Sequence, residues 1–147
     1  MNKSLQQGFS LIELLVVVAI IGILAAVGTV GYGNYVTQTK IKVTATNVDS
    51  VAASISTLNG LAQSGVDTTC SSYVTCTTGG ALSLTNFKNA YNTTETGTNA
   101  IILATNNPGC SATTQGRIYV NLVSTTVTIS GCTSATTSYN QTVNWAA

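Results

Sequence analysis

The sequence predicts an α+β protein in which one long N-terminal helix packs on an antiparallel sheet of about four strands. Three observations support this fold class. An apolar run extends from Phe9 to Val30, and apolar residues then recur at helical spacing from Ile41 to Ala62. Short segments that alternate between apolar and polar residues follow from position 101 onward. The sheet is therefore expected to fold onto the amphipathic second half of the helix.

The first half of the predicted helix is apolar on every side. At 1.5 Å per residue, Phe9–Val30 can cross the roughly 30 Å hydrocarbon core of a bilayer. The run contains one charge, Glu13, and no basic residue lies between Lys3 and Lys40. An ionised side chain in the hydrocarbon layer costs roughly 2.5–3.5 kcal/mol and is usually retained because it is paired. Glu13 therefore requires a counterion from outside its own segment.

The second half of the predicted helix is two-faced. Its apolar stripe comprises Ile41, Ala45, Val48, Ala52, Ile55 and Ala62, and Val51 and Leu58 widen it. Thr44, Asn47, Asp49 and Ser54 are expected to fall mostly outside this stripe. This pattern is typical of a helix that lies on a globular domain. Gly60 and Gly65 are the expected helix stops.

Four segments are predicted to be strands because their apolar residues alternate or cluster. The first is the short apolar run Ile101–Leu103. The others are Arg117–Val123, a run through Val127 and Ile129 that ends near Gly131, and a tail with Tyr139, Gln141, Val143 and Trp145 on one face. Ser124-Thr125 is expected to form a short hairpin turn, and Val143 and Trp145 to anchor the last strand on the core.

Size and charge limit the range of functions. The 147 residues suit one domain and an anchoring element, and only 6% of them are charged, with a net charge of +1. Threonine, serine, asparagine and glycine replace the usual surface charges, which favours close packing of many identical copies. The basic residues Lys40, Lys42, Lys88 and Arg117 are dispersed. No specific nucleic-acid partner is therefore indicated.

The four cysteines, Cys70, Cys76, Cys110 and Cys132, all follow the apolar run. An even number in an exported domain indicates disulfides, for which three pairings exist. We favour Cys70–Cys76 and Cys110–Cys132, because bonds between sequence neighbours close the smaller loops. A zinc site is disfavoured, since the chain has no histidine and the spacings lack the tight pairs of zinc knuckles.

No catalytic constellation is visible in the sequence. Histidine chemistry is impossible, and the acids Asp49, Asp67 and Glu95 show no pairing pattern for carboxylate catalysis. A glycine-rich phosphate loop is absent, and the isolated acids make a poor calcium site. We therefore expect no enzyme activity, no catalytic residues, no cofactor and no metal.

The N-terminal residues carry a specific resemblance. Lys3–Glu13 reads KSLQQGFSLIE and resembles the processing site of type IV prepilins and the related pseudopilins, a likeness that extends to about Tyr35. The resemblance implies that prepilin peptidase cuts between Gly8 and Phe9 and that Phe9 is then N-methylated. It also implies that Glu13 pairs with the Phe9 amine of a neighbouring subunit. An ordinary secretory signal would instead be cut after the apolar run, near Ala25-Ala26.

The resemblance also implies a pilin-like organisation. Residues 1–8 would be the cleaved leader, residues 9–35 the transmembrane and filament-core helix, and residues 36–147 the globular head. Where many relatives have proline, this chain has Val30, with Gly28, Gly31 and Gly33 around it. These glycines are either a weak point that lets the helix extend on assembly or sites of close helix packing. Cys110–Cys132 would resemble the disulfide that bounds a C-terminal surface loop in many pilins.

The leading hypothesis is a major pilin, a structural subunit of a type IV pilus (fimbrium) that serves adhesion, twitching motility or DNA uptake. The subunit would wait in the bacterial inner membrane, meet prepilin peptidase and the pilus assembly machinery, and form a homo-oligomeric filament on the cell surface. A minor pilin or a type II secretion pseudopilin is the alternative, distinguished by low abundance in sheared filaments. A monomeric membrane-anchored binding module is a third hypothesis, distinguished by the absence of crosslinked multimers.

Overall fold

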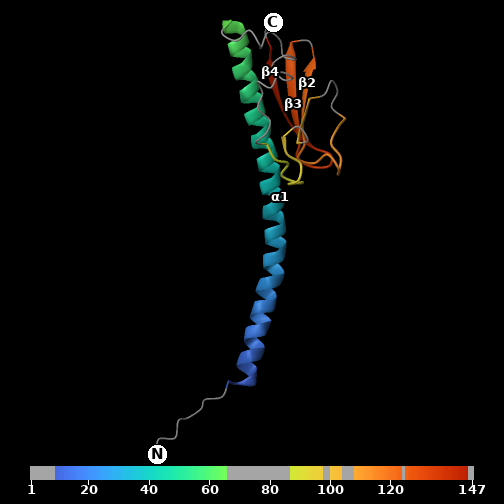
Figure 1. The fold of residues 1–147 in the computed structure, drawn as a ribbon. Helices are drawn as coiled ribbons and strands as arrows, with labels where there is room; N and C mark the ends of the chain where they lie inside the picture. Colours follow the sequence, from blue (N-terminus) through green and yellow to red (C-terminus); the bar gives the residue numbers. More distant parts are fainter. Residues whose placement is uncertain (1–8, 66–86, 98–99, 104–107, 124, 146–147) are drawn as a thin grey trace, which may run out of the picture. The chain divides into compact units, whose positions relative to one another are not determined.

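The computed structural model describes residues 9–65, 87–97, 100–103, 108–123 and 125–145. This part of the chain contains helix α1 (Leu11–Ser64) and strands β1 (Ile101–Leu103), β2 (Ile118–Val123), β3 (Thr126–Cys132) and β4 (Ser138–Asn144) (Figure 1). The chain divides into two compact units, Met1–Thr37 and Gln38–Ala147. The predicted α+β class, with one long helix and a sheet, is confirmed.

The described part of the first unit is helical from Leu11 onward and includes the whole apolar run. The first turn closes with a hydrogen bond from the Leu14 amide to the Ser10 carbonyl, at 3.3 Å. The helix continues without a break through Gly28, Gly31 and Gly33. Three glycines therefore do not interrupt it in the single chain, although each weakens a helix interior by about 1 kcal/mol relative to alanine.

In the second unit α1 ends at Ser64, and Gly65 follows with a φ of 67°. The Gly65 amide donates to the Ala62 carbonyl at 3.4 Å. A glycine in the left-handed region just past the last helical residue is a common helix end, because it has no side chain to clash there. Gly65 is therefore the stop that the sequence predicts. Gly60, the other expected stop, lies inside the helix.

The four strands form one sheet in the order β1-β2-β3-β4. β2 pairs antiparallel with β3, and β3 with β4. Val123 pairs with Thr126, so two residues connect β2 to β3, as the expected hairpin requires. The expectation of an all-antiparallel sheet is wrong for one pair, because β1 runs parallel to β2 with Ile101 opposite Ile118. Both strands of this pair therefore start at the same end of the sheet.

The core of the second unit lies between α1 and one face of the sheet. Figure 1 shows β2, β3 and β4 beside the second half of the helix. The buried core cluster comprises Val48, Val51 and Ile55 from the helix and Ile101, Ile118, Val120, Val127, Ile129 and Trp145 from the sheet side. Ala52, Leu58, Ala62 and Val143 pack around it. The predicted apolar stripe from Val48 to Ala62 and the anchoring role of the C-terminal tail are thus confirmed.

The helix approaches β3 most closely at Gly131. A side chain at this position would place its Cβ 2.4 Å from Val48 Cγ2 and 3.2 Å from Thr44 Cγ2. Thr44 is only 1% exposed, so the expectation that it falls outside the apolar stripe is wrong. Its hydroxyl donates to the Lys40 carbonyl at 3.0 Å, which leaves the methyl group to face the sheet. A threonine can therefore occupy a core position without an unpaired hydroxyl.

Candidate functional site

Glu13 caps the start of its own helix. Its Oε2 accepts a hydrogen bond from the Ser10 backbone amide at 2.9 Å. Since α1 begins at Leu11, Ser10 is the N-cap residue and Glu13 stands three positions further on. A glutamate in this place reaches back to the N-cap amide in the capping-box pattern. The Ser-x-x-Glu spacing in the sequence is the signal that could have predicted this cap.

A backbone amide does not neutralise the carboxylate. Among the described residues, the one ion pair joins Glu95 to Arg117. Glu13 therefore has no cationic partner in the described part of its own chain. Phe9, which directly precedes the N-cap residue, is 86% exposed. Gly8 lies outside the described residues. The arrangement thus presents an anion and an exposed apolar side chain at the same end of the helix.

The apolar run makes almost no contact within its own unit. Its large side chains from Leu11 to Val30 are 48% to 81% exposed. By length and composition, α1 contains a stretch that could cross a membrane, and no part of that stretch is buried among the described residues. Exposed apolar patches of this extent mark surfaces for membrane or protein contact. The segment therefore needs lipid or other protein around it.

Gly28, Gly31 and Gly33 all lie on open parts of this helix. A Cβ added at any of them would meet nothing within 4 Å in the single chain. Close packing inside the described chain therefore does not require glycine at these positions. Nearby, the Thr29 and Thr37 hydroxyls donate to the carbonyls of Ala26 and Gly33, each at 3.0 Å. Such back-bonding satisfies the hydroxyls where no other polar partner is near.

A disulfide joins Cys110 to Cys132 and ties the loop before β2 to the end of β3. The expected bond between these two cysteines is therefore present. Backbone hydrogen bonds reinforce the connection, from Gly116 to the Cys132 carbonyl at 2.8 Å and from Cys132 to the Arg117 carbonyl at 3.0 Å. Cys70 and Cys76, the other expected pair, lie outside the described residues.

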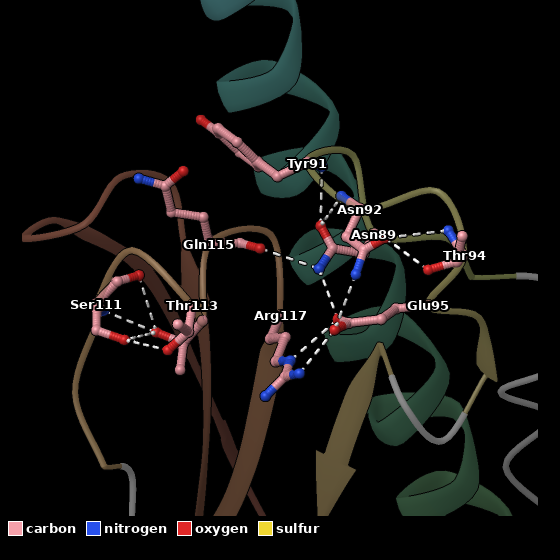
Figure 2. A network of polar contacts seen from close by, with 10 residues as sticks. Asn89, Tyr91, Asn92, Thr94, Glu95, Ser111, Thr113, Gln115 and Arg117 are labelled. Atoms are coloured by element: carbon pink, nitrogen blue, oxygen red, sulfur yellow. Dashed lines mark hydrogen bonds and ion pairs between the residues drawn. The ribbon is translucent and has the colours of Figure 1, made fainter.

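Beside this disulfide, a buried amide organises two loops into what we call the Asn89 network (Asn89, Glu95, Gln115 and Arg117). Figure 2 shows Asn89 between the other members. Asn89 is 1% exposed, and its Nδ2 donates to Glu95 Oε2 at 2.8 Å and to the Gln115 carbonyl at 2.9 Å. Its Oδ1 accepts from the Tyr91 amide at 2.8 Å. A buried side-chain amide with its groups satisfied fixes the surrounding loops.

Gly116 allows this packing. Its φ is 77°, and a Cβ there would lie 1.8 Å from Asn89 Oδ1. Glycine is thus required by both the backbone conformation and the available space.

Arg117 and Glu95 form a two-pronged ion pair within the network. Arg117 Nη2 lies 2.6 Å from Glu95 Oε1, and Nε lies 3.0 Å from Oε2. The hydrogen bonds from Arg117, aided by Asn89, lower the pKa of Glu95 to about 2, while partial burial opposes that shift. The same hydrogen bonds raise the pKa of Arg117. The sequence alone does not show this pair, because 22 positions separate Glu95 from Arg117.

The described residues contain no group of three or more histidine, cysteine or acidic side chains that could hold a metal ion. The Asn89 network joins structural loops, and its one acid is neutralised by an arginine. The two regions that the structure organises are therefore the exposed N-terminal helix with Glu13 and a head whose loops are fixed by a disulfide and an ion pair.

Comparison with known proteins bears on the first of these regions. The prokaryotic N-terminal methylation motif matches residues 3–29, which include Gly8, Phe9 and Glu13. The chain is 59% identical over 39 residues to a type IV major fimbrial protein FimA of Dichelobacter nodosus, which is 26% of this chain and 25% of that protein. It is 46% identical over 52 residues to a fimbrial protein of Moraxella nonliquefaciens, or 35% and 34% of the two chains.

The matched segment thus spans about a quarter of the FimA protein and about a third of the Moraxella protein. No solved structure gives a significant match to the chain. The methylation motif and the fimbrial relatives agree on one region: the N-terminal segment of this chain is similar to that of type IV fimbrial proteins.

Proposed function

We propose that this chain is a major pilin, the repeating structural subunit of a type IV pilus. The observation that carries the proposal is the exposed apolar helix with one anion, Glu13, inside the matched methylation motif. The fimbrial relatives support the same role, since one of them is a major fimbrial protein. The subunit would wait in the bacterial inner membrane and end in an extracellular filament.

The proposed assembly step is a charge pairing between subunits. Cleavage by prepilin peptidase after Gly8 creates a cationic amine on Phe9, which is then methylated without losing its charge. Glu13 of the next subunit accepts this amine as its counterion. Each charge alone is costly in an apolar medium, and pairing removes much of that cost. The Ser10 amide meanwhile keeps the first turn of the helix capped.

The apolar side chains supply the filament core in this proposal. Each helix exchanges lipid for neighbouring helices, so assembly depends on packing and charge pairing more than on new hydrophobic burial. Gly28, Gly31 and Gly33 act on this step, either by letting the helix extend or by letting neighbouring helices approach closely. Their lack of contacts within the described chain supports a role outside the single subunit.

Mass spectrometry of sheared surface filaments tests the processing step. The first residue of the dominant protein is expected to be Phe9 carrying one N-methyl group. A product that starts after Ala26 would contradict the proposal, because the apolar helix would then be lost. Low abundance of the chain in otherwise normal filaments would make it a minor pilin or a pseudopilin.

Substitution of Glu13 tests the docking role. Glu13→Gln keeps an acceptor for the Ser10 amide and removes the charge, whereas Glu13→Ala removes both. We expect both variants to insert into the membrane normally and to reduce filament yield at least about tenfold, because an unpaired buried charge costs several kcal/mol. Immunoblots of membrane and sheared fractions measure the two steps separately. Normal filament numbers with Glu13→Gln would remove the charge-pairing role.

A further inference from the structure

The head carries two oppositely charged patches on opposite sides of α1. We propose that these patches pair between adjacent copies of the chain and set the contact between neighbouring heads in the filament. The acidic flank is Asp49 with Tyr139 and Gln141, and the basic flank is Lys88 with Lys40. This inference rests on the proposed function, because it concerns the assembled filament.

The acidic flank holds an exposed carboxylate in a fixed position. Asp49 Oδ1 accepts hydrogen bonds from the Tyr139 hydroxyl at 3.1 Å and from Gln141 Nε2 at 3.0 Å. Gln141 Nε2 also lies 2.9 Å from the Tyr139 hydroxyl oxygen, so the two donors support each other. Both donors are neutral, and the described residues offer Asp49 no ion pair. The flank therefore presents a preoriented negative charge that forms no ion pair among the described residues; the lysine on the same side of α1, Lys42, stands about two turns away.

The basic flank stands on an equally fixed backbone. Asn47 Nδ2 donates to the Lys88 carbonyl at 3.2 Å, and Lys88 also pairs with Thr96 in an antiparallel bridge. These contacts hold the main chain of Lys88 while its side chain remains exposed. Lys40 lies two helical turns before Asn47 on the same side of α1, and its Nζ is 5.4 Å from the centre of the Tyr91 ring. The flank thus carries positive charge at a defined position.

Helix geometry places the two flanks apart. Asn47 and Asp49 are two positions apart and so point in directions about 200° apart around a helix with 3.6 residues per turn. Asn47 contacts the segment that carries Lys88, whereas Asp49 contacts β4. Complementary patches on different sides of one molecule cannot pair within it. Between copies they form a head-to-tail contact, which continues into a ring or a helical filament.

The charge pattern favours a second copy of this chain as the partner. The head has few charged residues, and Glu95 and Arg117 already neutralise each other. One acidic and one basic flank on the same molecule match each other without any other partner. On a neutral, hydroxyl-rich surface such a pair sets register and excludes wrong contacts more than it adds affinity. The occupant is therefore the neighbouring head.

Charge exchange in the full-length chain tests the proposal, with sheared filament yield normalised to membrane subunit as the readout. Asp49→Lys and Lys88→Asp are each expected to lower the yield by about fivefold, the factor that an exposed ion pair near 1 kcal/mol represents. The double exchange Asp49→Lys with Lys88→Asp restores an opposite pair and is expected to return the yield to near the wild-type value.

A second double variant controls for net charge. Lys42 lies on the same side of α1 as Asp49, about 10 Å away at 1.5 Å per residue over two turns. Asp49→Lys with Lys42→Asp has the same net charge as the first double variant but leaves Lys88 facing a lysine. The filament yield of this second double variant is expected to stay as low as that of Asp49→Lys alone. Equal rescue by both double variants would overturn the pairing.

Asp49→Asn is the control for a folding defect, because its amide oxygen can still accept hydrogen bonds from Tyr139 and Gln141. We expect about a twofold lower yield from the loss of the charge alone. An unchanged yield in Asp49→Asn and in Asp49→Lys would overturn the proposal. Failure of the proposed function would differ, since the wild-type chain would then form no filaments at all.

Discussion

One helix has two different environments in this protein. In α1 the large apolar side chains from Leu11 to Val30 are at least 48% exposed, whereas Val48, Val51 and Ile55 are 0% exposed. The second set has its partner in the same chain, namely the sheet. The first set has no such partner among the described residues. The comparison shows that the second half of α1 stabilises the folded unit that contains the sheet, while the first half is available to lipid or to other protein.

Matched isoleucine substitutions provide the strongest test of this contrast. Ile55→Ala is expected to lower the free energy of unfolding of the head by about 2–5 kcal/mol, because it removes packed core atoms and leaves a cavity. Ile21→Ala makes the same chemical change where the side chain is 58% exposed. It is expected to change the head's stability by less than about 0.5 kcal/mol.

Chemical unfolding of the full-length chain in detergent, followed by fluorescence of the buried Trp145, measures both variants. A loss of head stability in Ile21→Ala as large as in Ile55→Ala would contradict the division between the two halves. A lower filament yield with unchanged head stability in Ile21→Ala would support a role of the first half of α1 in contacts between subunits.

Removal of the disulfide is expected to have the next largest effect. Cys110→Ser with Cys132→Ser releases a loop of sequence separation 22 and should lower the free energy of unfolding by about 3 kcal/mol. Replacing both cysteines leaves no single thiol of this pair to react elsewhere. The same unfolding measurement reports the loss, and membrane insertion serves as the control that should not change. Unaltered stability would mean that the backbone hydrogen bonds around Cys132 are sufficient.

The ion pair of the Asn89 network predicts a smaller, pH-dependent effect. The pKa of Glu95 is lowered to about 2 in the folded head. An unfolded glutamate has a pKa of about 4.3, so the pair's contribution is fully present above that pH and is lost as the pH falls toward 2. Glu95→Gln is expected to cost about 1–2 kcal/mol at pH 7.

Wild-type and Glu95→Gln stabilities should therefore converge between about pH 4 and pH 2. Denaturant unfolding at several pH values measures the difference. A difference that stays constant over this range would show that Glu95 is not held ionised by Arg117.

The fold could be predicted wherever a sequence pattern reflects the buried face of a single helix or strand. The apolar stripe from Val48 to Ile55 and the alternation in β4 both reflect a single buried face. Thr44 was assigned to the wrong side because composition does not reveal that its hydroxyl bonds to the preceding turn. The parallel pairing of β1 was missed for a related reason, since strand direction depends on the path of the connection.

The candidate site was only partly predictable. Glu13 was visible because a lone charge in an apolar run is unusual, and its cap could have been found from the Ser-x-x-Glu spacing. The Asn89 network could not be predicted from the sequence, because Asn89, Glu95 and Arg117 come together only through the fold. No periodic pattern relates an amide, an acid and a base in separate loops.

The central claim is that Glu13 of one subunit pairs with the Phe9 amine of another. A density map of the assembled filament at side-chain resolution measures this contact directly. The account predicts that a Glu13 carboxylate oxygen lies within about 4 Å of the amine nitrogen of an adjacent subunit, the limit for an ion pair. Glu13 carboxylates and Phe9 amines that lie far apart, each surrounded by water, would contradict it.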